Sequence, residues 1–361
     1  MSTGQAMGAA EALSPREATR AILVDVERTM ESVLADERAR WATEAPRGLA
    51  LVDTVGALVA AGGKRLRPAF CVSGFLSAGG DPTDPRLPRL AAGLELLHVS
   101  ALLHDDILDC ADQRRGQPSA HVRHEATHRA AGWRGDPRRY GESVAILAGD
   151  LALVYADQVV DAARDAVLRE WTMLRSEMMV GQFLDVTIAA EYDADPDRSR
   201  WVAVCKSGSY SIHRPLSIGA QLAGRSDLAG AFQTYGAALG EAFQLRDDLI
   251  DAFGDDAAVG KPTGLDFEQQ KMTLLLALAI RRDARVRKLV LPNGGGPADG
   301  AAVDTDELRG LLISSGIRDE VEAHIDTLVA GAVAALDDTP LAEPWRRELT
   351  AMAHEVAYRD R

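Results

Sequence analysis

The chain has 361 residues, of which 47% are hydrophobic and 26% charged, and its formal net charge is -14 at pH 7. This composition can bury a large core and excludes a disordered chain. Because a phosphate backbone demands a basic surface, the acidic balance also excludes a general nucleic-acid partner. The length allows about two domains, but no change of composition marks a boundary. We therefore expect a flexible tail over residues 1–13 and a single domain over 14–361.

The cysteines and the apolar segments predict the compartment. Cys71, Cys110 and Cys205 have neither the spacing of a metal site nor an even count, which favours reduced thiols. We find no apolar run near the roughly 18 residues of a membrane span, and the N-terminus lacks a basic segment followed by an apolar one. A cytoplasmic protein without a membrane segment is expected.

Helical periodicity dominates the chain. Ser14-Pro15-Arg16-Glu17 is a capping box with proline at the first helical position, and it predicts a helix to about residue 42. Strand-like alternation is not convincing anywhere, and residues 123–141 and 294–300 are predicted to be irregular. The fold class is therefore predicted to be all-α. Further helices are predicted over about 48–60, 66–79, 86–112, 142–164, 167–190, 210–223, 227–253, 269–284, 306–315, 318–336 and 343–358.

Two aspartate clusters lie in apolar helical segments, at residues 105–109 and 247–251, and each reads Asp-Asp-x-x-Asp. A helical residue shares a face with its fourth neighbour, so Asp105 lies over Asp109 and Asp247 over Asp251. Like charges at that spacing repel, and carboxylates in apolar surroundings take up protons unless a cation is bound. The clusters therefore predict a hard divalent metal, and Mg²⁺ is favoured if phosphate completes its coordination.

Lysine is rare in this chain, and its positions are informative. Of five lysines, Lys64, Lys206, Lys261 and Lys271 lie in glycine-rich segments or close to the second aspartate cluster. A lysine is a compact charge suited to a diphosphate oxygen. Solvated surface positions are the alternative, but four lysines of five near such motifs favour ligand contact.

Three further residues flank the first cluster. His98 lies seven residues before Asp105, two helical turns along the same face, and so is expected to line a cavity below the metals. A packing role is equally consistent for a single histidine. Arg114 and Arg115 follow the expected helix end, where they could point two guanidinium groups at phosphate oxygens or simply complement the helix dipole.

These motifs, in order, resemble the trans-isoprenyl diphosphate synthases, also called polyprenyl synthetases. The matching segments are Gly-Gly-Lys-Arg-Leu-Arg-Pro (62–68), His-Asp-Asp-x-x-Asp (104–109), Arg-Arg-Gly-x-Pro (114–118), Phe-Gln-x-Arg-Asp-Asp-x-x-Asp (243–251), Gly-Lys-Pro (260–262) and Lys-x-Thr (271–273). The resemblance covers about residues 50–340. It implies a helical bundle around a deep central cavity, with the two aspartate motifs facing each other at the mouth, and usually a homodimer. It also implies the head-to-tail condensation of isopentenyl diphosphate with an allylic diphosphate.

The same resemblance implies a role for each matching residue. Three Mg²⁺ ions would be held by Asp105, Asp109 and Asp247, with Asp106, Asp248 and Asp251 in support. The allylic diphosphate would be contacted by Arg114, Lys206 and Lys261, and isopentenyl diphosphate by Lys64, Arg67, His98 and Arg115. Gln244 would lie beside the reacting carbons, Lys271 would complete the basic rim, and Gln182 would belong to the cavity wall.

Product length is predicted from two small residues. Ser100 and Ala101 lie one turn below Asp105, where short-chain members of the family often carry a bulky aromatic. A small floor favours geranylgeranyl diphosphate or a longer product, although small residues also ease helix packing. The segment at 264–268, where the family commonly has two acids and a leucine, departs from the pattern and keeps Asp266.

Two other classes of protein would share part of this pattern. A class I terpene cyclase would share the helical bundle and the first aspartate cluster, but its second metal site typically mixes Asn, Ser or Thr with Glu, and it would not need Lys64 and Arg67. A non-catalytic partner that regulates a prenyl synthase would be expected to have eroded metal motifs, and here both motifs are intact.

Overall fold

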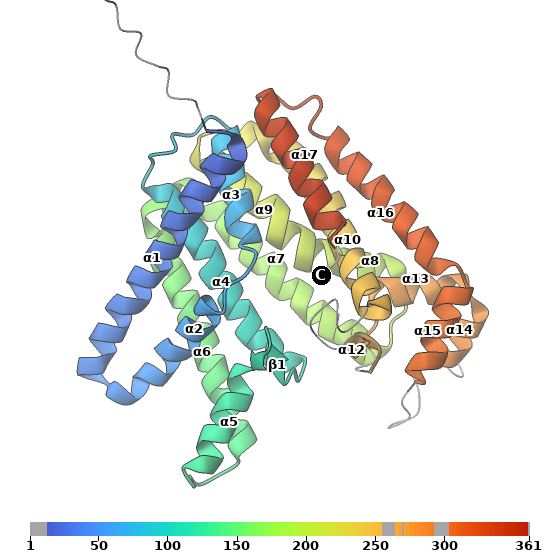
Figure 1. Ribbon diagram of the computed structural model, residues 1–361, viewed down its shortest axis with the longest axis horizontal. Helices are drawn as coiled ribbons and strands as arrows, with labels where there is room; N and C mark the ends of the chain where they lie inside the picture. Colours follow the sequence, from blue (N-terminus) through green and yellow to red (C-terminus); the bar gives the residue numbers. More distant parts are fainter. Residues whose placement is uncertain (1–12, 255–263, 269–270, 292–302, 360–361) are drawn as a thin grey trace, which may run out of the picture.

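The computed structural model describes residues 13–254, 264–268, 271–291 and 303–359, and these form a bundle of helices (Figure 1). The prediction of an all-α fold is confirmed. In chain order the α-helices are α1 (Pro15–Glu44), α2 (Leu49–Ala60), α3 (Leu66–Ser77), α4 (Arg86–Leu108), α5 (Ala120–Ala130), α6 (Pro137–Val160), α7 (Arg164–Glu191), α8 (Pro196–Ala203), α9 (Arg214–Leu222), α10 (Ala229–Phe253), α12 (Leu265–Glu268), α13 (Leu274–Arg282), α14 (Ala284–Val290), α15 (Thr305–Ser314), α16 (Ile317–Ala334) and α17 (Glu343–Ala357).

The start of α1 follows the predicted cap. The Ser14 Oγ accepts a hydrogen bond from the Glu17 backbone N–H at 3.3 Å, and the Glu17 carboxylate accepts one from the Ser14 N–H at 2.9 Å. Two of the unpaired N–H groups at a helix start are thereby satisfied. The capping box is confirmed. The N-terminal tail at 1–12 and the glycine-rich segment at 294–300 lie outside the described residues.

Two helices in the middle of the bundle carry the aspartate motifs. Helix α4 packs against α1, α3 and α6, and nearly all of its side chains from Leu87 to Leu97 are buried. Helix α10 packs against α16, α17 and a π-helix at Val204–His213. A helix that is apolar on every side is a core helix. The bundle therefore fixes the positions of Asp105 and Asp247, which lie near the C-terminal ends of α4 and α10.

The π-helix approaches α10 closely because two glycines meet there. A Cβ atom on Gly240 would lie 1.9 Å from the Gly208 Cα, which no side chain allows. In a π-helix each N–H bonds to the carbonyl five residues earlier, and such segments are often found at functional sites. Lys206, Tyr210 and Ser211 all belong to it.

Several elements were not expected from the sequence. The region 123–141 was predicted to be irregular, yet α5 covers much of it and α6 begins at Pro137. No strand was expected, but Gln113–Arg114 (β1) and Gln117–Pro118 (β2) pair as a short antiparallel hairpin. Arg115 and Gly116 connect them with φ of 54° and 73°. Positive φ at both connecting residues is typical of a type I′ turn, which suits a two-residue hairpin.

One stretch passes a simple test for a membrane span. An 18-residue window within Pro137–Glu191 has a mean hydropathy of 1.5, and half of that window is buried inside the bundle. The expectation that the chain has no apolar stretch of this length was therefore wrong, because this window is long and apolar enough. A core helix of a soluble protein passes the same test, so the window is weak support for a span.

Arg65 ties three helices together where α3 begins. Its guanidinium group contacts the Glu27 carboxylate of α1 and the Glu95 carboxylate of α4, each at 2.6 Å. The Glu95 side chain is only 3% exposed. A buried carboxylate without its partner is strongly destabilising. Arg65 is therefore a structural residue within the glycine-rich motif that also contains Lys64 and Arg67.

Replacing Arg65 tests this structural role. Arg65→Met should lower the free energy of unfolding by about 3–5 kcal/mol, because Glu95 keeps its buried charge without a partner. Urea denaturation followed by circular dichroism would measure the loss. Arg28→Met is the control, since the side chains of Arg28 and Asp25 are 70% and 51% exposed, and it should change little. Equal losses in the two variants would contradict the assignment.

Candidate active site

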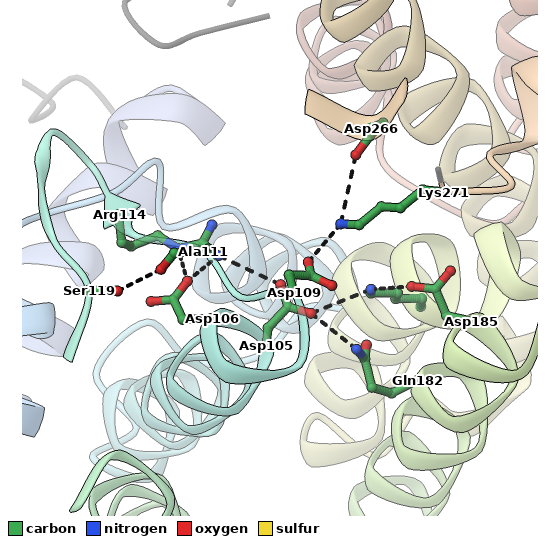
Figure 2. A network of polar contacts seen from close by, with 11 residues as sticks. Asp105, Asp106, Asp109, Ala111, Arg114, Ser119, Gln182, Asp185, Asp266 and Lys271 are labelled. Carbon is green, nitrogen blue, oxygen red and sulfur yellow. Dashed lines mark hydrogen bonds and ion pairs between the residues drawn. The ribbon is translucent and has the colours of Figure 1, made fainter. Parts of the chain in front are cut away.

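The first aspartate motif places two carboxylates on the same side of α4 (Figure 2). The Asp105 Oδ1 accepts a hydrogen bond from the Gln182 Nε2 of α7 at 3.1 Å and lies 3.5 Å from the Lys206 Nζ. The Asp109 Oδ2 lies 2.8 Å from the Lys271 Nζ. Both carboxylates thus face basic or amide groups of other elements.

Asp106 points to the other side of α4, toward the β1–β2 hairpin (Figure 2). Its Oδ1 accepts a hydrogen bond from the Arg114 Nε at 2.7 Å, and its side chain is 2% exposed. Burial raises the pKa of Asp106, and the Arg114 guanidinium opposes that rise. The Ser119 hydroxyl donates to the Ala111 carbonyl at 2.6 Å in the same region. Asp106 therefore fixes the hairpin that carries Arg114.

Lys206 extends from the π-helix to the first motif. Its Nζ lies 2.7 Å from the Asp185 Oδ2 of α7 as well as near Asp105. Burial lowers the pKa of Lys206, but the carboxylates of Asp185 and Asp105 outweigh that effect and raise it overall. The amine stays charged at neutral pH and offers a cation next to Asp105.

The second motif also combines exposed and buried carboxylates, but in a different proportion. The Asp247 side chain is 42% exposed and forms an ion pair with Arg359, whose pKa burial lowers to about 10. Asp248 is buried, and its carboxylate accepts hydrogen bonds from the Gln244 Nε2 at 2.9 Å and from the Leu275 backbone N–H at 3.1 Å. Burial raises the pKa of Asp248 to about 7.

Asp251 also accepts hydrogen bonds from backbone N–H groups. Its Oδ2 accepts a hydrogen bond from the Asp266 N–H at 3.1 Å, and its carbonyl accepts one from the Gly264 N–H at 2.8 Å. Asp248 and Asp251 therefore hold the segment that carries α12 and α13 against α10. Only Asp247 of this motif points outward.

Lys271 lies between the two motifs. Its Nζ contacts Asp109 and lies 3.7 Å from the Asp266 Oδ1 (Figure 2). A cavity of about 110 Å³ is lined by Lys271, Lys206, Gln244 and Asp266, among other residues. Lys271 and Lys206, which contact Asp109 and Asp105 of the first motif, therefore line one polar cavity with Gln244 of α10, and we call this cavity the mouth. Lys261 lies outside the described residues.

A larger cavity of about 280 Å³ shares Lys206 with the first and is also lined by Asp105. Its polar lining includes Arg67 and His98, and Ala101 also lines it, whereas Ser100 is buried outside this lining. Its apolar lining consists of Leu102, Leu108, Met178, Met179 and Phe243. The cavity thus combines charged groups with a long apolar wall.

Arg67 is held by the π-helix. Its Nη2 donates to the Ser211 Oγ at 2.8 Å, and its Cζ lies 4.3 Å from the centre of the Tyr210 ring. Its Nε is buried and has no hydrogen-bond partner among the described residues. His98 lies 3.5 Å from the Tyr210 hydroxyl, and burial, reinforced by Arg67 and other arginines, lowers the pKa of His98 well below its usual range. The imidazole is neutral at neutral pH.

Arg114 and Arg115 point in different directions. Arg114 faces the first aspartate motif, with its Nη2 3.7 Å from the Asp105 Oδ2. The Arg115 Nη1 donates to the Leu58 carbonyl of α2 at 3.3 Å. A Cβ on Gly63 would lie 2.9 Å from the Arg115 Nη2, so the glycine allows this approach. Lys64 is exposed beside them.

Tyr210, Ser211 and Arg359 were not predicted from the sequence as site residues. An α-helical register would turn Ser211 away from Lys206, whereas residues five apart share a face in a π-helix. Tyr210 is four residues from Lys206, a spacing that an α-helix would also place on one face. Arg359 lies far from both motifs in the chain, and no motif includes it. Asp185, one turn from Gln182 on α7, lines the smaller cavity and contacts Lys206.

The carboxylates suit a hard metal ion in their chemistry. Among the described residues, no three Asp, Glu, His or Cys side chains converge closely enough to hold a metal. Asp105, Asp109 and Asp247 are each paired with a lysine or arginine instead. All three present oxygen ligands, which Mg²⁺ prefers, and the paired cations occupy positions where positive charge is favourable.

Known proteins similar to this chain identify its family. Residues 50–302 match the model of the polyprenyl synthetase family. A short chain isoprenyl diphosphate synthase of Methanothermobacter thermautotrophicus is 32% identical over 257 residues, which is 70% of this chain and 73% of that protein. A nonaprenyl diphosphate synthase of Mycobacterium tuberculosis is 30% identical over 93% of this chain and 91% of its own length.

A solved structure is similar over nearly the whole chain. It is a geranylgeranyl pyrophosphate synthase of Corynebacterium glutamicum in complex with isoprenyl diphosphate and magnesium, with 34% identity, a TM-score of 0.84 and coverage of 96% of this chain and 99% of that one. The expected family and reaction class are confirmed. The chain belongs to the polyprenyl synthetase family and is a prenyltransferase, a trans-isoprenyl diphosphate synthase.

Proposed function

We propose that this synthase uses three Mg²⁺ ions, held between the ends of α4 and α10, to bind the diphosphate of an allylic substrate. The observation that carries the proposal is that Asp105 and Asp109 contact Lys206 and Lys271, two lysines that line one cavity together with Gln244 of α10. The magnesium complex of the Corynebacterium glutamicum relative supports it.

The two motifs would divide the work between ligation and positioning. Asp105, Asp109 and Asp247 would ligate the ions, because their carboxylates face the mouth or solvent. Three other carboxylates would act indirectly, since protein groups already occupy them: Asp106 through the hairpin, and Asp248 and Asp251 through the α12–α13 segment.

The basic groups around the mouth would hold the allylic diphosphate. Lys206 and Arg114 both lie near Asp105, so they can move from that carboxylate to a diphosphate oxygen as the site fills. Lys271 would complete the rim. Lys261 is proposed here from its motif alone.

Isopentenyl diphosphate would bind on the α3 side, at Lys64, Arg67, His98 and Arg115. Arg67 and His98 line the larger cavity. The Arg67 Nε is buried and has no hydrogen-bond partner among the described residues, so it can donate a hydrogen bond to an anion. Neutral His98 can donate one hydrogen bond without adding a charge.

The chemistry follows from this division of charge. Breaking the allylic carbon–oxygen bond leaves negative charge on the diphosphate, which bound Mg²⁺ would stabilise as a Lewis acid. Lys206, Arg114 and Lys271 add fixed positive charge at the same oxygens. The apolar wall from Leu102 to Phe243 excludes water from the allylic cation.

The double bond of isopentenyl diphosphate then attacks the cation, a carbon–carbon bond forms, and a proton is lost to the departing diphosphate. Gln244 would lie beside the reacting carbons. Its side chain lines the smaller cavity and donates to Asp248, which fixes its orientation.

A product of geranylgeranyl length or longer is proposed. Ala101 lines the larger cavity and leaves room for a growing tail. Ser100 was proposed together with it, and its burial outside this lining makes it the less direct candidate. The relatives include both geranylgeranyl and nonaprenyl diphosphate synthases.

A homodimer and a cytoplasmic location are proposed as well. Helices α6 and α7 expose large apolar side chains that a second copy would cover. They are Ile146, Leu147, Val154, Met173, Met179, Val180, Phe183 and Val186, with exposed fractions of 40% to 67%. All three cysteines are free thiols, which suits a reducing compartment.

Removing a ligand tests the metal assignment. Asp105→Ala and Asp247→Ala should each reduce turnover about a thousandfold, because charge on the leaving diphosphate loses its stabilisation. A condensation assay with Mg²⁺, isopentenyl diphosphate and each allylic starter would measure turnover, and thermal unfolding would check the fold. Glu31→Ala is the matched control, because Glu31 is an exposed acid on α1. Near-normal turnover in either aspartate variant would refute the assignment.

Filling the floor of the cavity tests product length. Ala101→Phe should shorten the main product by at least one isoprene unit, because the ring occupies space needed by the tail. Chromatographic sizing of dephosphorylated products would show it, with Ser100→Phe as the companion variant. If the Ala101→Phe enzyme keeps the wild-type rate and releases a product of wild-type length, the floor of the cavity lies elsewhere.

A charged substitution on α7 tests the dimer. Phe183 is 67% exposed, so Phe183→Glu should leave the folded chain intact but prevent association. Sedimentation velocity should show a dimer for the wild type and a monomer for the variant. Ile313→Glu is the control, because Ile313 is 59% exposed on α15. A wild-type monomer would rule out the proposal.

A further inference from the structure

The last described residue of the chain lies against the second aspartate motif. Helix α17 ends at Ala357, and two residues later Arg359 forms an ion pair with Asp247. The Arg359 Cζ also lies 4.0 Å from the centre of the Phe243 ring, one helical turn earlier on α10. Its side chain is only 16% exposed. A guanidinium group is therefore packed onto a carboxylate that the proposed function assigns to a metal.

The fold holds this arginine in place through its neighbours. The Arg246 Nε of α10 donates to the Ala357 carbonyl at 2.7 Å, and its other nitrogens contact Glu322 of α16. The Tyr358 hydroxyl donates to the Asp326 Oδ1 at 2.7 Å. The residues on both sides of the pair are thus anchored: Arg246 precedes Asp247, and Tyr358 precedes Arg359.

Asp247 differs from the other two acids of its motif in the kind of partner it has. Asp248 and Asp251 accept hydrogen bonds from backbone N–H groups, which a metal at the mouth would not displace. Asp247 instead faces a side-chain cation. A divalent ion and a guanidinium at the same carboxylate repel each other, so each weakens the binding of the other.

We propose that Arg359 is a built-in counter-ion that competes with the divalent metal for Asp247, so that metal binding at the second motif displaces the C-terminal residues from α10. This inference rests on the proposed function, because it takes Asp247 as a metal ligand. Coupling of this kind is reciprocal. Metal binding releases Arg359, and loss of Arg359 strengthens metal binding.

Metal affinity gives the first test. Mn²⁺ alone, followed as free ion by electron paramagnetic resonance, would be titrated into the wild type and Arg359→Gln. The variant should bind at least one ion about tenfold more tightly. Arg347→Gln is the control, because the Arg347 side chain is 72% exposed on α17, and it should match the wild type. Unchanged or weaker binding by Arg359→Gln would overturn the proposal.

Proteolysis gives the second test. Trypsin must take the Arg359 side chain into its own pocket to cut after it, so cleavage reports release from Asp247. Intact mass spectrometry would follow loss of the Asp360-Arg361 dipeptide. Mg²⁺ should accelerate that cut in the wild type. Asp247→Asn should be cut quickly without metal and should show no acceleration by Mg²⁺.

The outcomes separate this inference from the function on which it rests. If Asp247→Ala loses turnover while Mg²⁺ and Asp247→Asn leave the rate of the cut unchanged, the metal assignment stands and the counter-ion role is wrong. If Asp247→Ala keeps normal turnover, the metal assignment itself is wrong, and the competition falls with it.

Discussion

The structure depends on the pairing of ionised carboxylates with basic side chains at the ends of two core helices. A nearby cation offsets the free-energy cost of placing the charges of Asp105, Asp109 and Asp247 at the ends of core helices. Lys206, Lys271 and Arg359 supply that cation in the described residues. Because two of these groups border the mouth between the motifs, the site keeps positive charge where a diphosphate and its metals are proposed to bind.

Each aspartate motif joins two tasks that the shared Asp-Asp-x-x-Asp pattern does not distinguish. The outward ones, Asp105, Asp109 and Asp247, contact lysine or arginine side chains. The inward ones, Asp106 and Asp248, organise neighbouring loops by accepting hydrogen bonds from Arg114 and from the start of α13. A substitution at an inward acid would therefore disturb catalysis through the position of other groups. The outward acids are proposed to bind a ligand directly, whereas the inward acids position the protein groups beside it.

Helical periodicity and caps predicted most long helices, because they depend on local sequence. The short hairpin was missed since two-residue strands leave no alternation to detect, and α5 was missed because its arginines, histidines and alanines form no clear apolar stripe. In the site, the four-residue spacing placed Asp105 and Asp109 together correctly. It could not show where Asp106 finds its partner, because Arg114 reaches it only through the chain reversal that follows α4, where Cys110 has a φ of 49°.

Long-range contacts explain the remaining differences. Arg359 meets Asp247 across more than a hundred residues, and such a pair depends on how α17 packs against α10. Ser100 and Ala101 are neighbours on α4, but only Ala101 lines the cavity. Register alone limits the candidates to one face, and the packing of adjacent helices decides between them.

The π-helix at Val204–His213 has a consequence for how the two halves of the pocket meet. In an α-helix, residues five apart point about 140° away from each other, so an α-helical register here would turn Ser211 away from Lys206. In a π-helix, residues five apart share a face. Lys206 and Ser211 therefore border the same cavity, one near Asp105 and the other holding Arg67. The wider turn thus joins the two proposed anion-binding halves of the pocket on one helix.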